Sequence, residues 1–161
     1  MTRVPDLGPR GEGWVLVQFV LLGGIVLAGL AGLPGAGWSG AIRIAQVGLG
    51  SLAIGFGALL ALGGVIALGR SLSPFPSPTE ANRLVESGVY RYVRHPVYAG
   101  IVLASFGWGL VAGSLLAIVL ALLLLGWFDL KARREEVWLA ARHPDYAAYR
   151  TRTRKFLPFV Y

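Results

Sequence analysis

Long apolar runs constrain this chain more than any other feature of its sequence. Residues 14–33 are apolar except for Gln18, and residues 47–69 are apolar except for Ser51. A helix that crosses the hydrocarbon core of a bilayer needs about 20 such residues. The first run is also longer than the apolar core of a signal peptide, which has about 7–15 residues. We therefore expect both runs to form transmembrane helices.

A third apolar run, residues 97–128, is too long for a single span. One straight helix over this run would extend about 48 Å, whereas the hydrocarbon core of a bilayer is about 30 Å thick. Its middle contains Ala112, Gly113 and Ser114, a combination typical of turns. The run therefore predicts a tight hairpin of two short helices, residues 97–111 and 115–131.

The distribution of positive charge favours four spans over three. Arg43 lies alone in the first loop, and the other fourteen of the fifteen Lys and Arg residues fall in the N-terminal tail, the second loop and the C-terminal segment. Four helices place these three segments on one side of the membrane, whereas three helices would divide the charges six against nine. Loops rich in Lys and Arg stay in the cytoplasm. The sequence therefore predicts an all-α, polytopic membrane protein with about four transmembrane helices and both termini in the cytoplasm.

The composition agrees with a single membrane domain over residues 1–161. Charged residues make up 14% of the chain, against about 25% in soluble domains. The abundance of Ala, Gly, Leu and Arg is typical of bacteria, so we expect the inner membrane of a bacterium. Residues 70–96 and 131–161 are then the cytoplasmic segments, and the second includes a helix that leaves the membrane and ends at His143-Pro144.

The charge and the residue inventory also exclude several functions. The net charge of +7 flanks the apolar runs, which anionic lipid headgroups explain better than nucleic acid does. There are no cysteines and only two histidines, so disulfides and thiolate nucleophiles are excluded and no metal site is expected. The oligomeric state stays open.

Small residues recur every four positions in the second run, at Ala53, Gly57 and Ala61. Such residues share one face of a helix and let a neighbouring helix approach closely. We therefore expect this face to be a helix–helix contact.

Arg94, His95 and Pro96 precede the third run. Proline is favoured at the first position of a helix, and the free N–H groups there attract anions. Arg94 adds a positive charge, so this segment is able to hold a carboxylate or a phosphate. The alternative is an interfacial anchor, in which Arg94 reaches the headgroups and Tyr98 lies in the aromatic belt.

Glu135 and Glu136 lie on the helix that continues beyond the third run. Adjacent helical positions differ by about 100° in direction, so we expect at most one of the two carboxylates to face a shared pocket. The alternative is a solvated, charged helix face. The sequence does not decide which glutamate faces inward.

An ordered set of motifs covers about residues 84–159. It reads Leu84-Val85-x-x-Gly88-x-Tyr90-Arg91-x-x-Arg94-His95-Pro96-x-Tyr98-x-Gly100, Glu135-Glu136, Tyr146-x-x-Tyr149-x-x-Arg152 and Leu157-Pro158-Phe159. This set resembles the isoprenylcysteine carboxyl methyltransferase family, with the phospholipid methyltransferases as more distant relatives. It departs from the family at Arg142–Asp145, where relatives often carry Phe-Gly-Glu-Glu before the tyrosine.

The resemblance implies an integral membrane enzyme that uses S-adenosylmethionine. In such enzymes the Arg-His-Pro and Glu-Glu segments form a cofactor pocket at the cytoplasmic face, and the hairpin between them brings the two together. The cofactor-binding residues implied are Val85, Gly88, Tyr92, Arg94, His95, Pro96, Tyr98, Gly100, Glu135 and Glu136. The catalytic residues implied are Arg134, Glu136 and Arg152.

Each group is expected to have a role. The helix start and a nearby arginine would hold the cofactor's carboxylate, while Glu135 or Glu136 accepts hydrogen bonds from its ribose or amino group. Tyr92 and Tyr98 would pack on the adenine or the sulfonium. Arg134 or Arg152 would position an anionic acceptor, and for an amine acceptor Glu136 or a tyrosine would take the proton.

The identity of the methyl acceptor stays open at this point. We expect a lipophilic molecule that enters from the bilayer. A small thiol, an isoprenoid acid and a lipid amine are all compatible with the sequence. The methylated atom is therefore O, N or S. Two other functions are also compatible with the sequence: an NADPH-dependent membrane reductase of the sterol type, and a non-enzymatic membrane scaffold.

Overall fold

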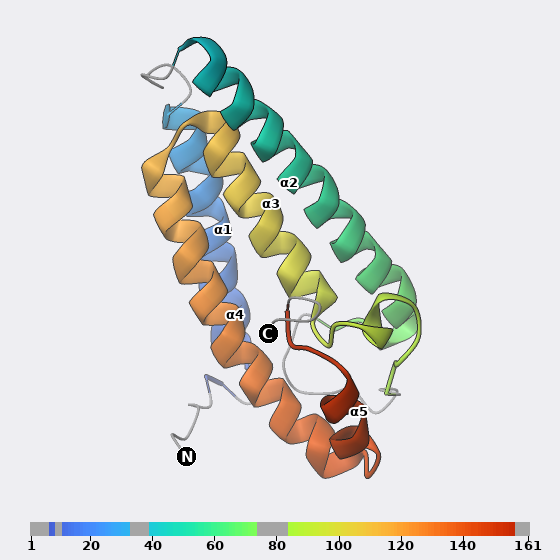
Figure 1. Ribbon diagram of the computed structural model, residues 1–161. Coiled ribbons are helices and arrows are strands. Elements are labelled where there is room, and N and C mark those ends of the chain that lie inside the picture. The colour runs from blue at the N-terminus through green and yellow to red at the C-terminus, as the bar shows by residue number, and fades with distance from the viewer. Residues whose placement is uncertain (1–6, 9–10, 33–38, 74–83, 157–161) are drawn as a thin grey trace.

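The computed structural model describes residues 7–8, 11–32, 39–73 and 84–156, and this part of the chain is helical. Figure 1 shows long helices running side by side, with shorter elements gathered at one end. The elements are α1 (Glu12–Gly32), α2 (Gly40–Leu68), the 3-10 helices η1 (Gly69–Ser71) and η2 (Gly88–Arg91), α3 (Pro96–Ala112), α4 (Leu115–Arg142) and α5 (Tyr146–Arg152). The all-α prediction is therefore confirmed for the described residues.

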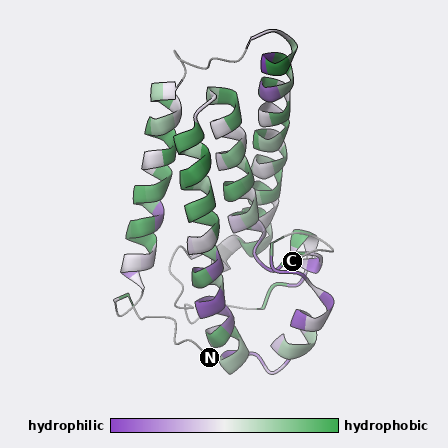
Figure 2. Cartoon of the chain, turned by 60° about the vertical axis from the view of Figure 1, so that its left-hand side comes forward, coloured by the Kyte–Doolittle hydropathy of each residue, from purple (hydrophilic) through white to green (hydrophobic). Residues whose placement is uncertain are grey.

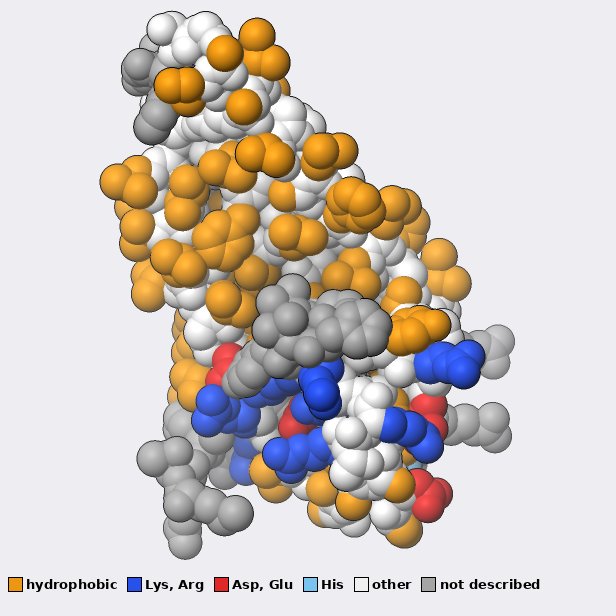
Figure 3. Space-filling model, viewed as in Figure 1, with side chains coloured by type: hydrophobic (Ala, Val, Ile, Leu, Met, Phe, Trp, Pro, Cys, Tyr) orange, Lys and Arg blue, Asp and Glu red, His pale blue; other side chains and the backbone are white. Residues whose placement is uncertain are grey.

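Three of these helices, α1, α2 and α4, are long and apolar enough to cross a membrane. α3 is shorter, with 17 residues, and is also apolar. The predicted spans match α1 and α3 within two residues at each end, whereas α2 begins seven residues earlier than expected. Large exposed apolar side chains cover the helices, as Figure 3 shows for the face in view, and Figure 2 shows that the helices consist mainly of hydrophobic residues. This is the surface that hydrocarbon chains require.

The predicted hairpin is present between α3 and α4. α3 ends at Ala112, and Gly113 adopts a left-handed conformation with φ of 65° while its N–H bonds back to Gly109 and Leu110. A left-handed residue after a helix is most often glycine, because glycine has no Cβ to clash. Ser114 then caps α4 by accepting from the N–H of Ala117 at 3.2 Å, and its hydroxyl donates to the carbonyl of Ala28 at 2.9 Å. The turn is thereby fixed to α1.

α2 and α3 approach each other through glycines, as the small-residue face of α2 predicts. A Cβ added to Gly57 would lie 2.5 Å from the carbonyl oxygen of Gly100. A Cβ added to Gly100 would in turn lie 2.6 Å from the backbone nitrogen of Ala61. The two backbones are therefore in direct contact, and α3 is held along its length by α2.

α1 packs on α4 through aromatic and polar contacts. The rings of Trp14 and Trp127 lie 4.5 Å apart, and the indole of Trp127 donates to the carbonyl of Trp14 at 3.1 Å. Between the same two helices, the ammonium of Lys131 donates to Gln18 at 2.8 Å. Gln18 is the one polar residue that interrupts the first apolar run, and this bond gives it a partner.

α4 changes character along its length. Its first part, to about residue 130, is apolar, but five of the six residues in 131–136 are charged. The helix continues through this segment to Arg142 and ends at His143-Pro144, as the sequence predicts. Figure 2 shows the hydrophilic stretch at the same end of the molecule as α5. The fold therefore carries a charged helical extension beyond the apolar helices.

Candidate functional site

Four segments meet at the charged end of the molecule: η2, the start of α3, the extension of α4, and α5 with the residues after it (Figure 1). The chain after α5 runs beside the chain before α3. Val93 and Arg154 form an isolated parallel bridge. The N–H of Arg94 donates to the carbonyl of Arg154 at 2.8 Å, and that of His95 donates to Lys155 at 3.1 Å. This pairing brings the C-terminal segment onto the Arg-His-Pro motif.

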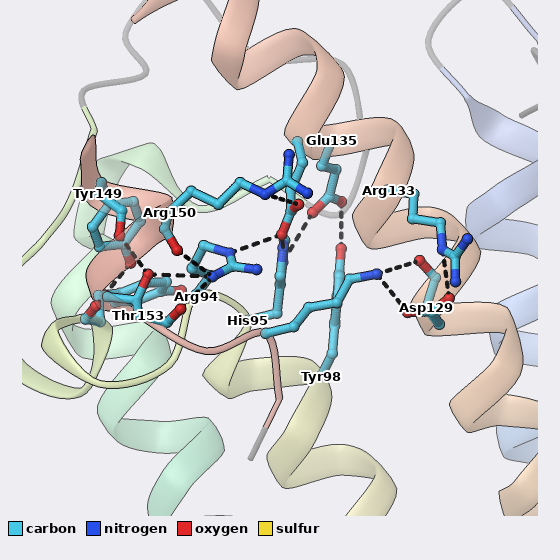
Figure 4. A network of polar contacts seen from close by, with 12 residues as sticks. Arg94, His95, Tyr98, Asp129, Arg133, Glu135, Tyr149, Arg150 and Thr153 are labelled. Carbon is cyan, nitrogen blue, oxygen red and sulfur yellow. Dashed lines mark hydrogen bonds and ion pairs between the residues drawn. The ribbon is translucent and has the colours of Figure 1, made fainter. Parts of the chain in front are cut away.

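Arg94 links three of these segments. Its Nε donates to Oε1 of Glu136 on α4 at 2.9 Å, and both side chains are about one-tenth exposed. Its Nη1 donates to the carbonyl of Thr153, after α5, at 2.6 Å (Figure 4). Because the guanidinium is largely buried and hydrogen-bonded on both sides, it holds the α4 extension and the C-terminal segment at a fixed separation.

His95 lies between the two glutamates. Its Nε2 is 3.2 Å from Oε1 of Glu136, and its Nδ1 is 3.6 Å from Oε2 of Glu135. Both carboxylates therefore contact one imidazole, although at different atoms, and which of them would face a cofactor stays a prediction. Two directions about 100° apart on the helix still converge on one imidazole, because the two ring nitrogens of His95 face opposite ways.

Tyr98 adds an aromatic stack on the membrane side of the cluster. Its hydroxyl donates to Oε1 of Glu135 at 2.5 Å (Figure 4). Its ring is stacked on Phe128 with centroids 4.4 Å apart and on His95 at 5.6 Å. The ammonium of Lys131 lies 5.1 Å from the centre of the same ring. One side of the site is thus formed by stacked aromatic rings, with the buried ammonium of Lys131 next to them.

The two glutamates have opposite electrostatic environments. Burial raises the pKa of Glu136, but hydrogen bonds and charge from His95 and Arg94 outweigh burial and lower it to about 2. Burial also raises the pKa of Glu135, and there the charges of His95 and Lys131 and the Tyr98 hydrogen bond offset it only in part. Glu136 is therefore a fixed anion, whereas Glu135 is the carboxylate that takes up a proton more readily.

Two tyrosines of α5 complete the site. The hydroxyl of Tyr149 donates to the carbonyl of Tyr90 at 2.8 Å. The hydroxyl of Tyr146 is buried and has no hydrogen-bond partner among the described residues. Burial raises the pKa of both phenols, and the charge of Glu136 contributes to each shift. A cavity of about 370 Å³ borders Tyr146, His143 and Arg150, between the end of α4 and α5.

The structure brings together half of the predicted cofactor-binding residues. Arg94, His95, Tyr98, Glu135 and Glu136 form the connected cluster described above. Segments about 40 residues apart in the chain meet there, and the predicted hairpin lies between them.

The other predicted cofactor-binding residues lie around or away from this cluster. Pro96 is buried at the first position of α3, and Gly88 begins η2 with φ of 61°. Val85 is half-buried just before η2. Tyr92 is 57% exposed, and Gly100 lies in the contact between α2 and α3.

The predicted catalytic arginines have aromatic and acidic neighbours. The guanidinium of Arg134 is stacked over the ring of Trp138 on the same helix, 4.7 Å from its centre. Arg152 is exposed and pairs with Glu86. Glu136 is a predicted catalytic residue that contacts Arg94 and His95 directly.

Several residues of the site were not predicted. The backbone of Thr153 carries no signal in the sequence. Arg150, whose Nε is 4.0 Å from Oε2 of Glu136, is marked in the sequence only as one of many basic residues. Lys155 is buried and pairs with Asp129 at 2.5 Å. Gln18 and Lys131 did give a signal, because Gln18 interrupts one apolar run and Lys131 follows another, and a buried polar residue there requires a partner.

This arrangement defines a class of protein: a bundle of long apolar helices with a compact polar site where the apolar part ends. A sequence model of the phospholipid methyltransferase family matches residues 45–145, more than half of the chain. The chain therefore belongs to the phospholipid methyltransferase family.

Two curated proteins are similar to part of the chain. The cobalt-zinc-cadmium resistance protein CzcN of Cupriavidus metallidurans is 38% identical over 48% of this chain and 36% of its own length. The protein-S-isoprenylcysteine O-methyltransferase of Schizosaccharomyces pombe is 32% identical over 48% of this chain and 34% of its own length. The matches thus span about a third of each relative. The second match confirms the resemblance drawn from the motifs, and no solved structure matches the chain.

Proposed function

We propose that this protein is an integral membrane methyltransferase that uses S-adenosylmethionine and acts on a lipophilic acceptor. The observation that carries the proposal is that Arg94 and His95 meet Glu136, which lies 42 and 41 residues further along the chain, in one buried network. Membership of the phospholipid methyltransferase family supports the reaction type.

The residues present fit such a cofactor. S-adenosylmethionine carries a carboxylate, an ammonium, ribose hydroxyls and a sulfonium, and the site offers arginines, carboxylates and stacked rings. The buried hydroxyl of Tyr146 has no partner among the described residues, although the charge of Glu136 acts on it. A buried hydroxyl without a partner is costly, so a polar ligand at this position would satisfy it.

The chain's residues would divide the work as follows. Arg94 and the exposed Arg150 would hold the carboxylate of the cofactor, and Glu136, which stays ionised, would accept from its ribose or amino group. The rings of Tyr98 and Phe128 would face the sulfonium, which aromatic faces attract. When bound, the cofactor supplies an electrophilic methyl group. The protein's main contribution is alignment, which supplies up to about 7–11 kcal/mol.

The proposed topology has four spans: α1, α2, α3 and the apolar part of α4, with both termini in the cytoplasm. With 17 residues, α3 is about 26 Å long, at the short end of what crosses a bilayer. Charge supports this orientation, since the site and its arginines then lie on the positive, cytoplasmic side.

Cofactor binding tests the proposal directly. The protein is purified in detergent and titrated with S-adenosylmethionine and, in parallel, with NADPH. We expect saturable binding of the first only. Glu136→Gln should weaken it about ten- to hundredfold, because a hydrogen bond to a charged group contributes about 1.5–3 kcal/mol. Asp145→Asn, which removes an exposed carboxylate nearby, is the matched control and should bind as the wild type does.

The outcomes separate the alternatives. Binding of NADPH instead would favour a membrane reductase, and binding of neither cofactor at millimolar concentration would favour a scaffold. Either result would overturn the methyltransferase proposal. If Glu136→Gln and Asp145→Asn lose cofactor affinity equally, the role assigned to Glu136 is wrong, but the methyltransferase proposal is not affected.

A further inference from the structure

Glu135 is a half-buried carboxylate, with its side chain 17% exposed, and the proposed binding of the cofactor by Arg94 and Glu136 leaves it without a role. It lies on the side of the cluster next to the apolar helices, where its Oε1 accepts from Tyr98. A lipophilic acceptor entering from the bilayer would reach this side first. The groups proposed to bind the cofactor lie on the other side, where Arg94 and Arg150 form ion pairs with Glu136.

A continuous chain of titratable groups runs through the site, and Figure 4 shows it from Tyr98 through Glu135 to His95. The contacts are Tyr98 to Glu135 at 2.5 Å, Glu135 to Nδ1 of His95 at 3.6 Å, and Nε2 of His95 to Glu136 at 3.2 Å. Each neighbouring pair is close enough for a proton to pass after a small rotation. The chain leads from the membrane side toward the exposed Arg150.

The groups facing Glu135 come from every element packed around it. Lys131 and Glu136 share its helix, Tyr98 belongs to α3, His95 precedes α3, and Tyr90 of η2 acts on it at longer range. Burial raises the pKa of Glu135, whereas Glu136 next to it is kept ionised. Two adjacent carboxylates in opposite environments are a common arrangement where one accepts protons and the other stays charged.

We propose that Glu135 is the proton acceptor of the reaction and that His95 relays the proton away from it. This inference rests on the proposed methyltransferase function. In the proposed step an N–H or S–H bond of the methyl acceptor breaks and an O–H bond forms on Glu135. The electron pair left on nitrogen or sulfur becomes the nucleophile. The proton then passes to Nδ1 of His95 and is released to water.

The relay specifies the chemical class of the acceptor. A carboxylate acceptor is already ionised at neutral pH, since terminal carboxyl groups have pKa values of about 3.3–3.7, and it has no proton to give. A proton-accepting carboxylate at this position is useful only for an acceptor that must lose a proton. The site is therefore built for an ammonium or a thiol at the end of an apolar chain.

Infrared spectroscopy tests the proton acceptor without any acceptor molecule. In the detergent-purified protein, the stretching band of a protonated carboxyl group should titrate at a pH above 4.5, the ordinary value for glutamate. The band should disappear in Glu135→Gln and shift in Glu135→Asp, while Asp145→Asn should leave it unchanged. A wild-type protein without such a band, or a band that survives in Glu135→Gln, would overturn the proposal.

Three acceptor probes test the class. Dodecylamine, dodecanethiol and dodecanoate share one alkyl chain and differ only in the reacting group. Transfer of labelled methyl groups to the amine or the thiol is expected, with at least a tenfold loss in Glu135→Gln when both proteins are saturated with the cofactor. Transfer to dodecanoate alone would overturn the proposal. If no probe reacts, the infrared result decides.

The cofactor titration separates the two proposals. If the wild-type protein does not bind S-adenosylmethionine, the methyltransferase proposal itself is wrong. If the protein binds the cofactor but shows no titrating carboxyl band from Glu135, only the proton-relay proposal is wrong.

Discussion

At the scale of single residues, the site depends on a few side chains with several partners each. Arg94 donates both to Glu136 and to the backbone of Thr153, and His95 contacts both glutamates. Such groups act as a unit, so the loss of one exposes the others to an unpaired charge or an unsatisfied donor. Substitutions here should therefore affect both folding and binding, and the two effects need separate measurements.

Glu136 makes the stability of the protein depend on pH. Its pKa falls from 4.5 to about 2 on folding, so its stabilising effect of about 3 kcal/mol is complete above pH 4.5 and is lost as the pH drops toward 2. We expect the difference in free energy of unfolding between wild type and Glu136→Gln to shrink over this interval. Unfolding in detergent at a series of pH values measures it, and a difference that stays constant with pH would contradict the assignment.

Tyr146 and Tyr149 provide a matched pair for hydrogen bonding. Tyr149→Phe removes the bond to the carbonyl of Tyr90 and should cost about 1 kcal/mol of unfolding free energy. Tyr146→Phe removes a buried hydroxyl that has no partner among the described residues, so it should be neutral or slightly stabilising. Thermal unfolding of both variants without ligand makes the comparison. An equal loss in both would show that Tyr146 is hydrogen-bonded after all.

At the scale of elements, the hairpin was predictable because length and turn chemistry agree. The run over residues 97–128 exceeds one span, and Gly113 supplies the left-handed residue that the turn requires. The start of α2 was not predictable to the same degree, because residues 40–46 include Arg43 and Gln46. The guanidinium of Arg43 donates to the carbonyl of Val111 at 2.8 Å, a tertiary contact that extends the helix.

The contact between α2 and α3 gives a test at this scale. Gly57→Ala places a Cβ 2.5 Å from the carbonyl of Gly100, so the helices must separate, and overpacking of this kind costs about 1–3 kcal/mol. Gly55→Ala on the same helix meets nothing within 4 Å and is the control. Thermal unfolding in detergent should show a clear loss for the first and none for the second. Equal stability would mean that α2 and α3 are not in backbone contact.

At the scale of the whole molecule, the meeting of the two motifs was predictable and its details were not. A hairpin between Arg94 and Glu136 returns the chain to the same end, which length and charge alone indicate. The placement of Thr153 and Lys155 beside them depends on backbone pairing between short irregular segments. Such pairing leaves no periodic signature in the sequence. The convergence of both glutamates on His95 likewise depends on the exact position of the ring between helices.

The chain lacks cysteine, so single cysteines can report its orientation in the membrane. Arg91→Cys and Ala148→Cys introduce exposed thiols near the site, and Ala41→Cys introduces one at the opposite end of α2. An impermeant maleimide added to cells should label only Ala41→Cys, and inverted vesicles should give the reverse. Labelling of Arg91→Cys and Ala148→Cys from opposite sides would contradict the four-span topology and the shared site.

The bond between Gln18 and Lys131 has a consequence for biosynthesis. The two residues are 113 positions apart, so the first helix leaves the ribosome long before its partner is translated. During that interval the amide of Gln18 is in lipid or at the insertion machinery without its final donor. α1 is therefore expected to remain loosely associated with the other helices until α4 is inserted and supplies the ammonium group of Lys131.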